Sequence, residues 1–265
     1  MPRTRRKLNL RSAITSAALS LACATGPVHA AFVDELFLDG YETACGNLIY
    51  SEPFSGADGS AWPSPWVPIG NVALSDIQLG TARLRPGSTN YSLARMHAAV
   101  ANRNVELRYR LRMDDIATQG VGFYVRQNAG YLTQTPTHGQ GYAAFVETNF
   151  RGQPGISVWK EENGDEIQLL HAPAPSPAMA NGVDYRVRFQ VVQVNAGTTR
   201  VRASLWRAID VEPTLWQASV DDTTAVLQNI SGGLAIDSWS VLLNPASITA
   251  HTYVDDIEAI SLCSP

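Results

Sequence analysis

The carboxylates are the residues best suited to acid–base chemistry, and they are densest in one short stretch. Residues 161–166 read Glu-Glu-Asn-Gly-Asp-Glu. Glycoside hydrolysis needs two carboxylates facing one cleft, about 5 Å apart for retention or roughly 6.5 to 9.5 Å apart for inversion. Asn163-Gly164 is a strong hairpin signal, so we expect these charges at a hairpin tip, in solvent. Glu106 and Glu147 lie in two other expected strands and could face one another.

No other pattern predicts catalysis. The histidines outside the first 30 residues are too scattered for a zinc site. They are His97, His138, His171 and His251. A Gly-x-Ser-x-Gly nucleophile elbow is absent from the sequence. The residues therefore favour a protein without catalysis, and leave open an enzyme whose acids converge only in the fold.

Four carboxylates near the two ends of the expected domain could hold a structural calcium ion, which prefers oxygen ligands. They are Glu52, Asp58, Asp255 and Asp256. They converge only if the first and last strands pair. The alternative is that Asp58-Gly59 makes a turn and Asp255-Asp256 marks a bulge, and both interpretations stay open.

Aromatic side chains offer a different chemistry, because sugar rings stack on exposed aromatic faces. The candidate platforms are Trp62, Tyr91, Tyr131, Trp159 and Trp239. Trp62, between Ser60-Ala61 and Pro63, is expected to be the most exposed. Tyr131 falls in a Gly/Thr-rich stretch, residues 127–140, and loops of this kind often carry binding residues. The competing interpretation is that a tryptophan in a strand packs in the core.

Arginines alternate with other residues along three expected strands. They are Arg108, Arg110, Arg112, Arg186, Arg188, Arg200 and Arg202. If these strands are neighbours, Arg108 and Arg110 become part of a basic stripe that could clamp an acidic polysaccharide. The alternative is that acidic residues pair with them across the sheet.

The elements that must position these side chains are β-strands. Between residues 105 and 113 apolar and charged residues alternate with a period of two, which indicates a strand with one buried face. A dozen or so such runs follow from residue 47 onward, separated by turn signals, and no window shows a capped helical stripe. We therefore predict a short acidic lead-in at residues 31–46 and one β-sandwich domain over residues 47–265.

The first 30 residues have the build of a secretory signal peptide. Five basic residues precede a run of small apolar residues, and the stretch ends at Val28-His29-Ala30. The run is too short and too interrupted for a membrane span. We predict cleavage after Ala30 and a secreted or periplasmic protein. A lipoprotein acylated at Cys23 is the minority alternative.

Removal of this leader lowers the net charge from −4 to −9. Such a balance argues against nucleic-acid binding, which depends on neutralising phosphates with Lys and Arg. Two cysteines remain, Cys45 and Cys263, one near each end of the expected domain. We predict a disulfide between them, as suits an oxidising compartment. Two unrelated thiols are the alternative.

Three stretches together resemble a known family. They are Phe54-Ser-Gly-Ala-Asp58-Gly59 followed by Trp62 and Trp66, then Gly182-Val-Asp-Tyr185-Arg-Val-Arg-Phe-Gln-Val, and Tyr253-Val-Asp255-Asp256-Ile257. The pattern, over residues 47–262, resembles the concanavalin A-like, laminin-G-like jelly rolls of bacterial exported proteins. The resemblance implies two face-to-face antiparallel sheets with adjacent terminal strands. Members often bind glycans, and some hydrolyse or eliminate them.

The combined prediction is an all-β, two-sheet jelly-roll sandwich that is exported behind a signal peptide and binds carbohydrate without catalysis. Its expected partner is a glycan, an acidic polysaccharide if the arginine stripe is open. A glycoside hydrolase or polysaccharide lyase on the same sandwich is one alternative. An envelope or adhesion protein that binds another protein is the second.

Overall fold

The computed structural model describes residues 46–87, 92–134, 136–147, 154–174, 178–242 and 248–263. The predicted signal peptide, residues 1–30, lies outside the described residues, as do Cys45 and Tyr91. Two antiparallel sheets and one 3-10 helix, η1 (Ala225–Leu227), make up the described structure. Within it, no helix is long and apolar enough to cross a bilayer.

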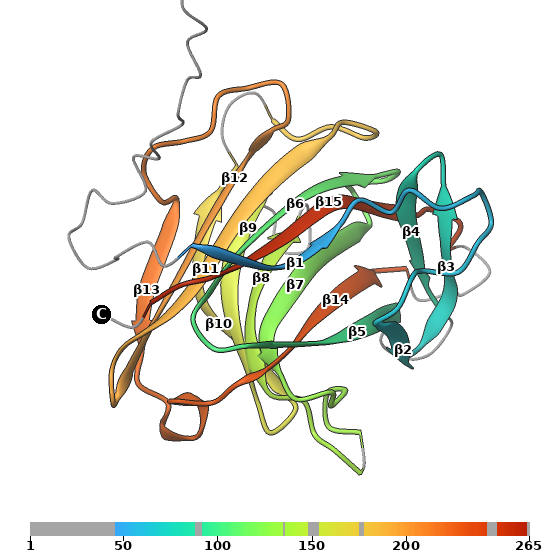
Figure 1. Cartoon of the computed structure of the whole chain (residues 1–265). Coiled ribbons are helices and arrows are strands. Elements are labelled where there is room, and N and C mark those ends of the chain that lie inside the picture. Colours follow the sequence, from blue (N-terminus) through green and yellow to red (C-terminus); the bar gives the residue numbers. More distant parts are fainter. Residues whose placement is uncertain are drawn as a thin grey trace, which may run out of the picture. The chain divides into compact units, whose positions relative to one another are not determined.

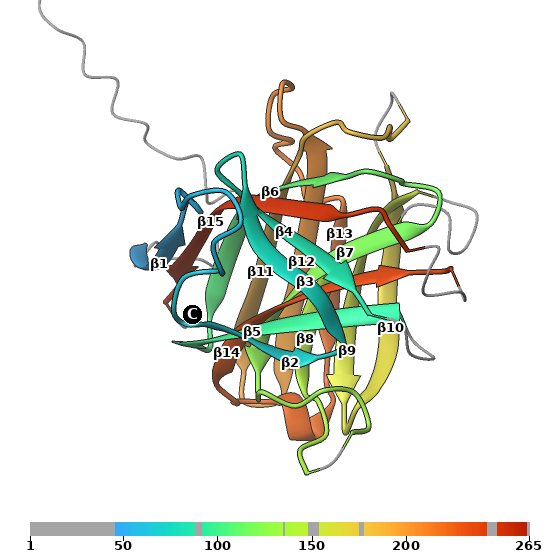
Figure 2. The ribbon, with the colours of Figure 1, turned by 90° about the vertical axis from the view of Figure 1, so that its right-hand side faces the viewer.

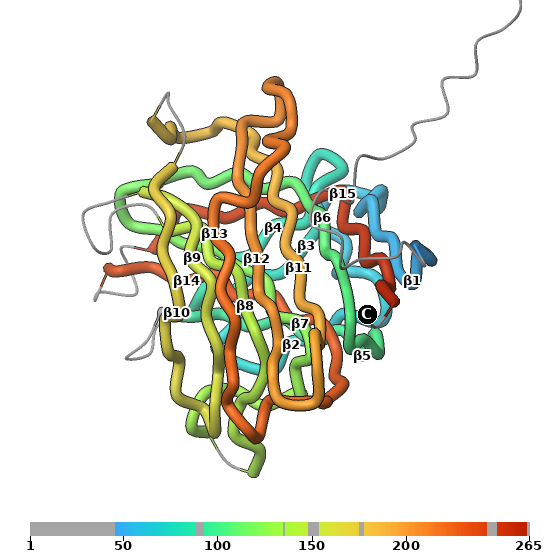
Figure 3. The backbone as a smooth tube through the Cα atoms, turned by 90° about the vertical axis from the view of Figure 1, so that its left-hand side faces the viewer, coloured from blue at the N-terminus to red at the C-terminus, as the bar shows by residue number. Residues whose placement is uncertain are grey.

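The larger sheet has eight strands, and its edge strand β13 with the adjacent β12 and β11 can be followed in Figure 3. Its order is β13 (Ala218–Asp222), β12 (Thr198–Arg207), β11 (Tyr185–Asn195), β6 (Val105–Met113), β15 (Thr252–Ser261), β4 (Thr81–Pro86) and β3 (Val72–Gln78), with β1 (Asn47–Glu52) paired to β15.

The smaller sheet has seven strands, and Figure 2 shows β2, β5 and β14 side by side in it. Its order is β10 (Asp165–Pro173), β9 (Gly155–Glu162), β8 (Gly141–Glu147), β7 (Gln119–Gln127), β14 (Gly232–Ser240), β5 (Ser92–Asn102) and β2 (Trp66–Gly70).

The core lies between the two sheets and follows from the alternation in the sequence. In β6, Leu107, Tyr109 and Leu111 are buried, and Arg108 and Arg110 between them are half-buried on the other side. The rings of Tyr109 and Phe123, the latter on β7, lie with their centroids 4.2 Å apart and join the two sheets. The predicted all-β, two-sheet antiparallel sandwich is confirmed.

Local turn chemistry also follows the sequence. Asn163 and Gly164 have φ angles of 53° and 87°, and this pair of positive values suits the two-residue hairpin that joins β9 to β10. The first and last strands are neighbours, with Asn47 of β1 opposite Ser261 of β15 (Figure 1). Cys263 follows β15 closely, but its predicted partner Cys45 lies outside the described residues, so the disulfide stays a prediction.

Candidate functional site

The outer face of the seven-stranded sheet is unusual because its central strands are buried on both sides. Every residue of β7 and β8 is buried. In β8, Tyr142, Ala144 and Val146 belong to the core between the sheets, so Phe145 and Glu147 point outward. We call this surface the aromatic face. Its outward side chains include Arg95, Tyr124, Phe145, Glu147, Ser157, Trp159, Glu161, Glu166, Gln168, His171, Asp237 and Trp239.

A cluster of aromatic rings lies on this face. Tyr124, Phe145 and Trp159 come from β7, β8 and β9, and they pack with Ala143 and Ala235 as a second apolar cluster apart from the main core. The rings of Phe145 and Trp159 meet edge to face, with centroids 5.8 Å apart. Alternation along three neighbouring strands brings these rings together.

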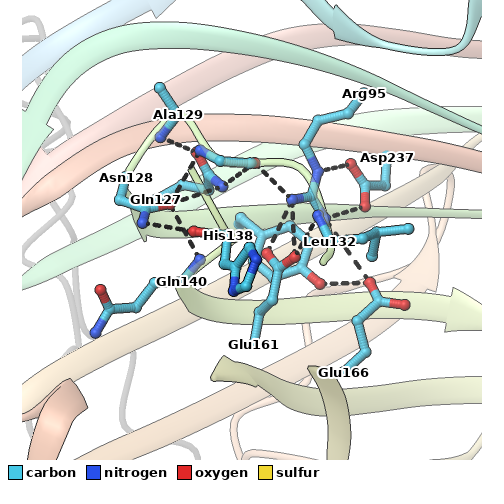
Figure 4. Close-up of polar contacts among 12 residues, drawn as sticks. Arg95, Gln127, Asn128, Ala129, Leu132, His138, Gln140, Glu161, Glu166 and Asp237 are labelled. Carbon is cyan, nitrogen blue, oxygen red and sulfur yellow. Dashed lines mark hydrogen bonds and ion pairs between the residues drawn. The ribbon is translucent and has the colours of Figure 1, made fainter. Parts of the chain in front are cut away.

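Arg95 of β5 organises the charged side chains beside this cluster (Figure 4). Its Nε and Nη2 donate to the two oxygens of Asp237, both at 2.7 Å. Its Nη1 lies 2.8 Å from Glu161 Oε2 and also donates to the backbone oxygen of Gly130. The side chains of Arg95, Asp237 and Glu161 are all fully buried. A bidentate pair with a second carboxylate is the arrangement that a buried guanidinium requires.

Glu166 of β10 is the member of this cluster that reaches solvent. Its side chain is 26% exposed and lies 3.8 Å from Arg95 Nη2. Tyr124 donates its hydroxyl to Glu166 Oε1 over 2.6 Å. Burial, reinforced by the negative charge of Asp237, raises the pKa of the Glu166 carboxyl to about 7. Glu166 therefore exchanges a proton with solvent near neutral pH.

The loop between β7 and β8, described at residues 128–134 and 136–140, is fastened to this cluster. Leu132 donates its backbone N–H to Glu161 Oε1, and Tyr131 donates its hydroxyl to the backbone oxygen of Leu93. A Cβ at Gly139 would lie 1.9 Å from Glu161 Oε1, so only glycine lets the loop approach this closely. The buried carboxylate thus holds both the arginine and the loop.

Another polar group on the same face is centred on Ser157 of β9. Ser157 Oγ lies 3.0 Å from Glu147 Oε2 and 2.8 Å from His171 Nδ1. Gln168 donates its Nε2 to the same hydroxyl over 3.0 Å. Ser157 is fully buried, whereas His171 and Gln168 are half-buried and reach the surface.

A surface pocket of about 570 Å³ lies beside the loop between β7 and β8. Its lining is mixed: Asn128, His138, Gln140, Asn163 and Glu162 contribute polar side chains, and Pro136 and Val226 contribute apolar ones. His138 Nδ1 lies 2.9 Å from Asn163 Oδ1, which joins the loop to the hairpin tip. The pocket has the size of a small-molecule site but includes none of the aromatic rings.

The predicted aromatic platforms are placed differently from the expectation. Trp62 is only 6% exposed, packs against Phe54 and Trp66 in the core, and donates its Nε1 to the backbone oxygen of Asp76. Its predicted exposure is wrong, because Trp62 fills the end of the core beside β3. Trp159 lies on the aromatic face but is 7% exposed. Tyr131 is half-buried, and Tyr91 lies outside the described residues.

The arginine stripe lies on the outer face of the eight-stranded sheet, which we call the charged face. Arg108 stands opposite Arg188, and Arg110 opposite Arg186, on β6 and β11. Acids lie between them: Arg108 pairs with Glu106 and Glu212, and Arg110 with Asp184, Asp255 and Asp256. The strands that carry these arginines are neighbours, as the prediction of a basic stripe required. Acidic side chains pair with the arginines, as the alternative required. A ligand role for Arg108 and Arg110 stays a prediction.

The four predicted calcium ligands are engaged with protein groups at three different places. Glu52 accepts the N–H of Phe54, and Asp58 accepts the N–H of Leu79. Asp255 and Asp256 stand at an irregularity in the β15 ladder, where Asp256 has a φ of 50°, and both contact Arg110. Among the described residues no group of three or more His, Cys, Asp or Glu side chains could hold a metal ion. Calcium binding stays a prediction.

Sequence reasoning missed the buried acids of the aromatic face. It placed residues 161–166 in solvent, whereas Glu161 is fully buried under the loop. Glu106 and Glu147 lie on opposite outer faces and do not meet. One available signal was a lone charge in an apolar strand, at Arg95 in Leu-Ala-Arg-Met and at Asp237 in Ala-Ile-Asp-Ser. Such buried charges predict partners, although not which ones.

Comparison with known proteins supports the fold. No protein-family model matches the sequence, and no curated protein matches it. A protein of unknown function with a galectin-like fold from Bacillus subtilis is 8% identical, with a TM-score of 0.57 over 83% of this chain and 98% of its own. The alginate lyase Aly36B is 14% identical, with a TM-score of 0.52 over 81% of this chain and 97% of its own.

A glycosyl hydrolase family 16 protein from Mycobacterium smegmatis is also similar, with 13% identity and a TM-score of 0.50 over 80% of this chain and 100% of its own. At such identities the likeness concerns the fold and not the activity. The two antiparallel sheets, the adjacent terminal strands and these neighbours together identify the fold of this chain as a concanavalin A-like jelly roll.

Proposed function

We propose that the protein is an exported, lectin-like carbohydrate-binding module, and that its ligand lies across the aromatic face. The observation that carries this proposal is a half-buried tryptophan, Trp239 of β14, on a face that has a buried aromatic cluster at its centre and half-buried hydrogen-bonding side chains along its edge strand β10. Carbohydrate sites combine such an aromatic surface with a few placed polar groups. The fold neighbours support the proposal, since an alginate lyase and a family 16 glycosyl hydrolase share this architecture.

Trp239 has a platform geometry because of the glycine beside it. Trp239 of β14 stands opposite Gly120 of β7. A Cβ at Gly120 would lie 2.0 Å from Trp239 Cζ2, so the indole rests directly on the glycine backbone. A half-buried indole that lies flat against a sheet is the kind of aromatic surface on which sugar rings stack.

Polar side chains on the same face can read sugar hydroxyls. Gln168, His171 and Glu166 are half-buried on β10, the edge strand of this sheet. An amide, an imidazole and a carboxyl offer both donors and acceptors. Ser157 and Tyr124 hold His171 and Glu166 in place through their hydroxyl groups.

The carboxylates of this face favour binding over hydrolysis. Hydrolysis needs two carboxyl groups that both reach the substrate. Asp237 and Glu161 are fully buried and engaged by Arg95, and Glu147 is 4% exposed. Only Glu166, among the described acids of this face, has a side chain open to solvent.

A glycan array with the mature protein tests the proposal, followed by calorimetry with the best oligosaccharide. Trp239→Ala should weaken binding at least about tenfold, because it removes the stacking surface. Trp216→Ala is the matched control: this half-buried indole lies on the charged face, against Arg188. His138→Ala probes the surface pocket beside the loop.

Absence of binding to every neutral and acidic glycan on the array would refute the proposed function. Loss of binding in His138→Ala with none in Trp239→Ala would move the site to the pocket and overturn the proposed location. The same measurement with a chelator tests the predicted calcium, because a calcium-dependent site would lose affinity. N-terminal sequencing of protein recovered outside the cytoplasm tests cleavage after Ala30.

A further inference from the structure

The charge of the aromatic face distinguishes classes of carbohydrate. Four carboxylates stand among its described side chains, Glu147, Glu161, Glu166 and Asp237, against one guanidinium, that of Arg95. A surface of this sign repels uronates and sulfates and leaves neutral sugars unaffected.

Arg95 cannot compensate by receiving an anion. Its Nε donates to Asp237, its Nη1 to Glu161 and to the oxygen of Gly130, and its Nη2 to Asp237. The group is fully buried, with Tyr124 against its plane at 4.5 Å. These bonds take four of the five N–H donors of the guanidinium, and Nη2, which carries the fifth, lies 3.8 Å from Glu166, so Arg95 is turned toward the acids of the cluster and not toward a ligand.

We propose that the carbohydrate bound on the aromatic face is neutral, and that the carboxyl of Glu166 is the specificity-determining group that rejects uronate and sulfated glycans. This inference rests on the proposed carbohydrate-binding function. Glu166 is the acid of the cluster that a ligand can approach, and its Oε1 accepts the Tyr124 hydroxyl. The cation 3.8 Å from it, Arg95, is already bound to Asp237 and Glu161, so it does not neutralise Glu166 as well.

The protonation state of Glu166 determines the pH range in which acidic glycans are repelled. The groups packed around it are Arg95 from β5, Asp237 from β14, Tyr124 from β7, Glu161 from β9 and Tyr131 from the loop. Burial and the charge of Asp237 hold the pKa of Glu166 at about 7. Above that pH the carboxyl is anionic and opposes acidic glycans, and below it the neutral carboxyl no longer does.

The test uses matched oligosaccharides that differ only in charge, β-1,4-linked mannose and mannuronate tetramers, within an array of neutral glycans and their uronate counterparts. At pH 8 we expect neutral glycans to bind and every uronate counterpart to bind at least about tenfold more weakly. Glu166→Gln should narrow that gap severalfold, and the readout is the ratio of the neutral to the uronate affinity within each protein, because removal of a negative charge favours the uronate relative to its neutral counterpart.

Asp165→Asn is the matched control, because it removes one charge from the same hairpin at an exposed position. It should leave the gap unchanged. Titration of the unmodified protein from pH 8 to pH 6 repeats the test without a mutation, and the gap should shrink. Uronate glycans that bind as tightly as neutral ones at pH 8 would overturn this inference while leaving the carbohydrate-binding function standing. Absence of all glycan binding would instead refute the function itself.

Discussion

The two outer faces of the sandwich both carry arginines paired with acids, but in different surroundings. On the charged face, Arg108 and Arg110 are 28% and 32% exposed, and each shares several acids with its neighbours. On the aromatic face, Arg95 and its partners Asp237 and Glu161 are fully buried. The same chemical pairing therefore occurs once in contact with water and once away from it.

Exposure to water determines how much each ion pair contributes to the free energy of unfolding. An exposed ion pair gains little, because solvent can replace either partner. A buried pair gains little over an apolar substitute as well, but removal of one member leaves a charge with neither water nor a partner. The comparison teaches that the buried group of Arg95, Asp237 and Glu161 does not tolerate the loss of a single member, whereas the charged face can lose single charges.

Removal of one arginine from each face gives the sharpest contrast. Arg95→Met should lower the free energy of unfolding by about 4 kcal/mol, since Asp237 and Glu161 remain buried without their cation. Arg186→Met, at a side chain 45% exposed on the charged face, should cost under about 1 kcal/mol. Denaturant unfolding of the two variants measures both values, and equal losses would break the comparison.

The second-largest difference between the two faces should appear in how the free energy of unfolding depends on pH. The pKa of Glu166 is about 7 in the folded protein against an ordinary value of 4.5, so the folded state binds this proton more tightly than the unfolded state does. Stability from this carboxyl is present below pH 4.5 and is lost as the pH rises to 7, by roughly 2 to 3 kcal/mol.

Glu166→Gln should flatten that pH dependence, and Glu258→Gln, at an exposed position of β15 on the charged face, should preserve it. Urea unfolding at several pH values between 5 and 8 provides the readout. An unchanged slope in Glu166→Gln would show that another group on the aromatic face carries the titration.

The smallest of the three expected differences between the faces concerns a methyl group added at a glycine in each sheet. In Gly120→Ala the new methyl group would displace the indole of Trp239, at a cost of about 1 to 3 kcal/mol together with loss of glycan binding. Gly197→Ala, in the β11–β12 turn of the other sheet, finds its nearest atom at 3.9 Å and should stay within about 0.5 kcal/mol. Thermal melts measure the stability of both variants, and calorimetry measures their glycan binding. A Gly120→Ala variant with unchanged stability and unchanged binding would contradict the role of Trp239 as the stacking platform.

Local pattern sufficed to predict much of the fold. The alternation in β6 identifies its buried face, and Asn163-Gly164 identifies the β9–β10 hairpin, because both depend on neighbouring residues. The Arg95 cluster could not be predicted in the same way. Asp237 stands 142 positions from Arg95, and only the order of strands in the sheet brings them into contact.

Trp62 illustrates a second limit. Its flanking Ser, Ala and Pro residues are typical of an exposed loop, yet its indole reaches Asp76 and the aromatic end of the core. A loop residue can contribute to the core when the loop folds back over an open end of the sandwich. Sequence neighbours describe the path of the backbone and not the direction of a long side chain.

The position of β15 in the eight-stranded sheet has a consequence for how the domain folds. This strand stands between β6 and β4 and also pairs with β1, the first described strand. Until β15 is in place these strands cannot join, so the larger sheet stays divided. Such long-range pairing makes folding slow and leaves unpaired strand edges open to association in the interval.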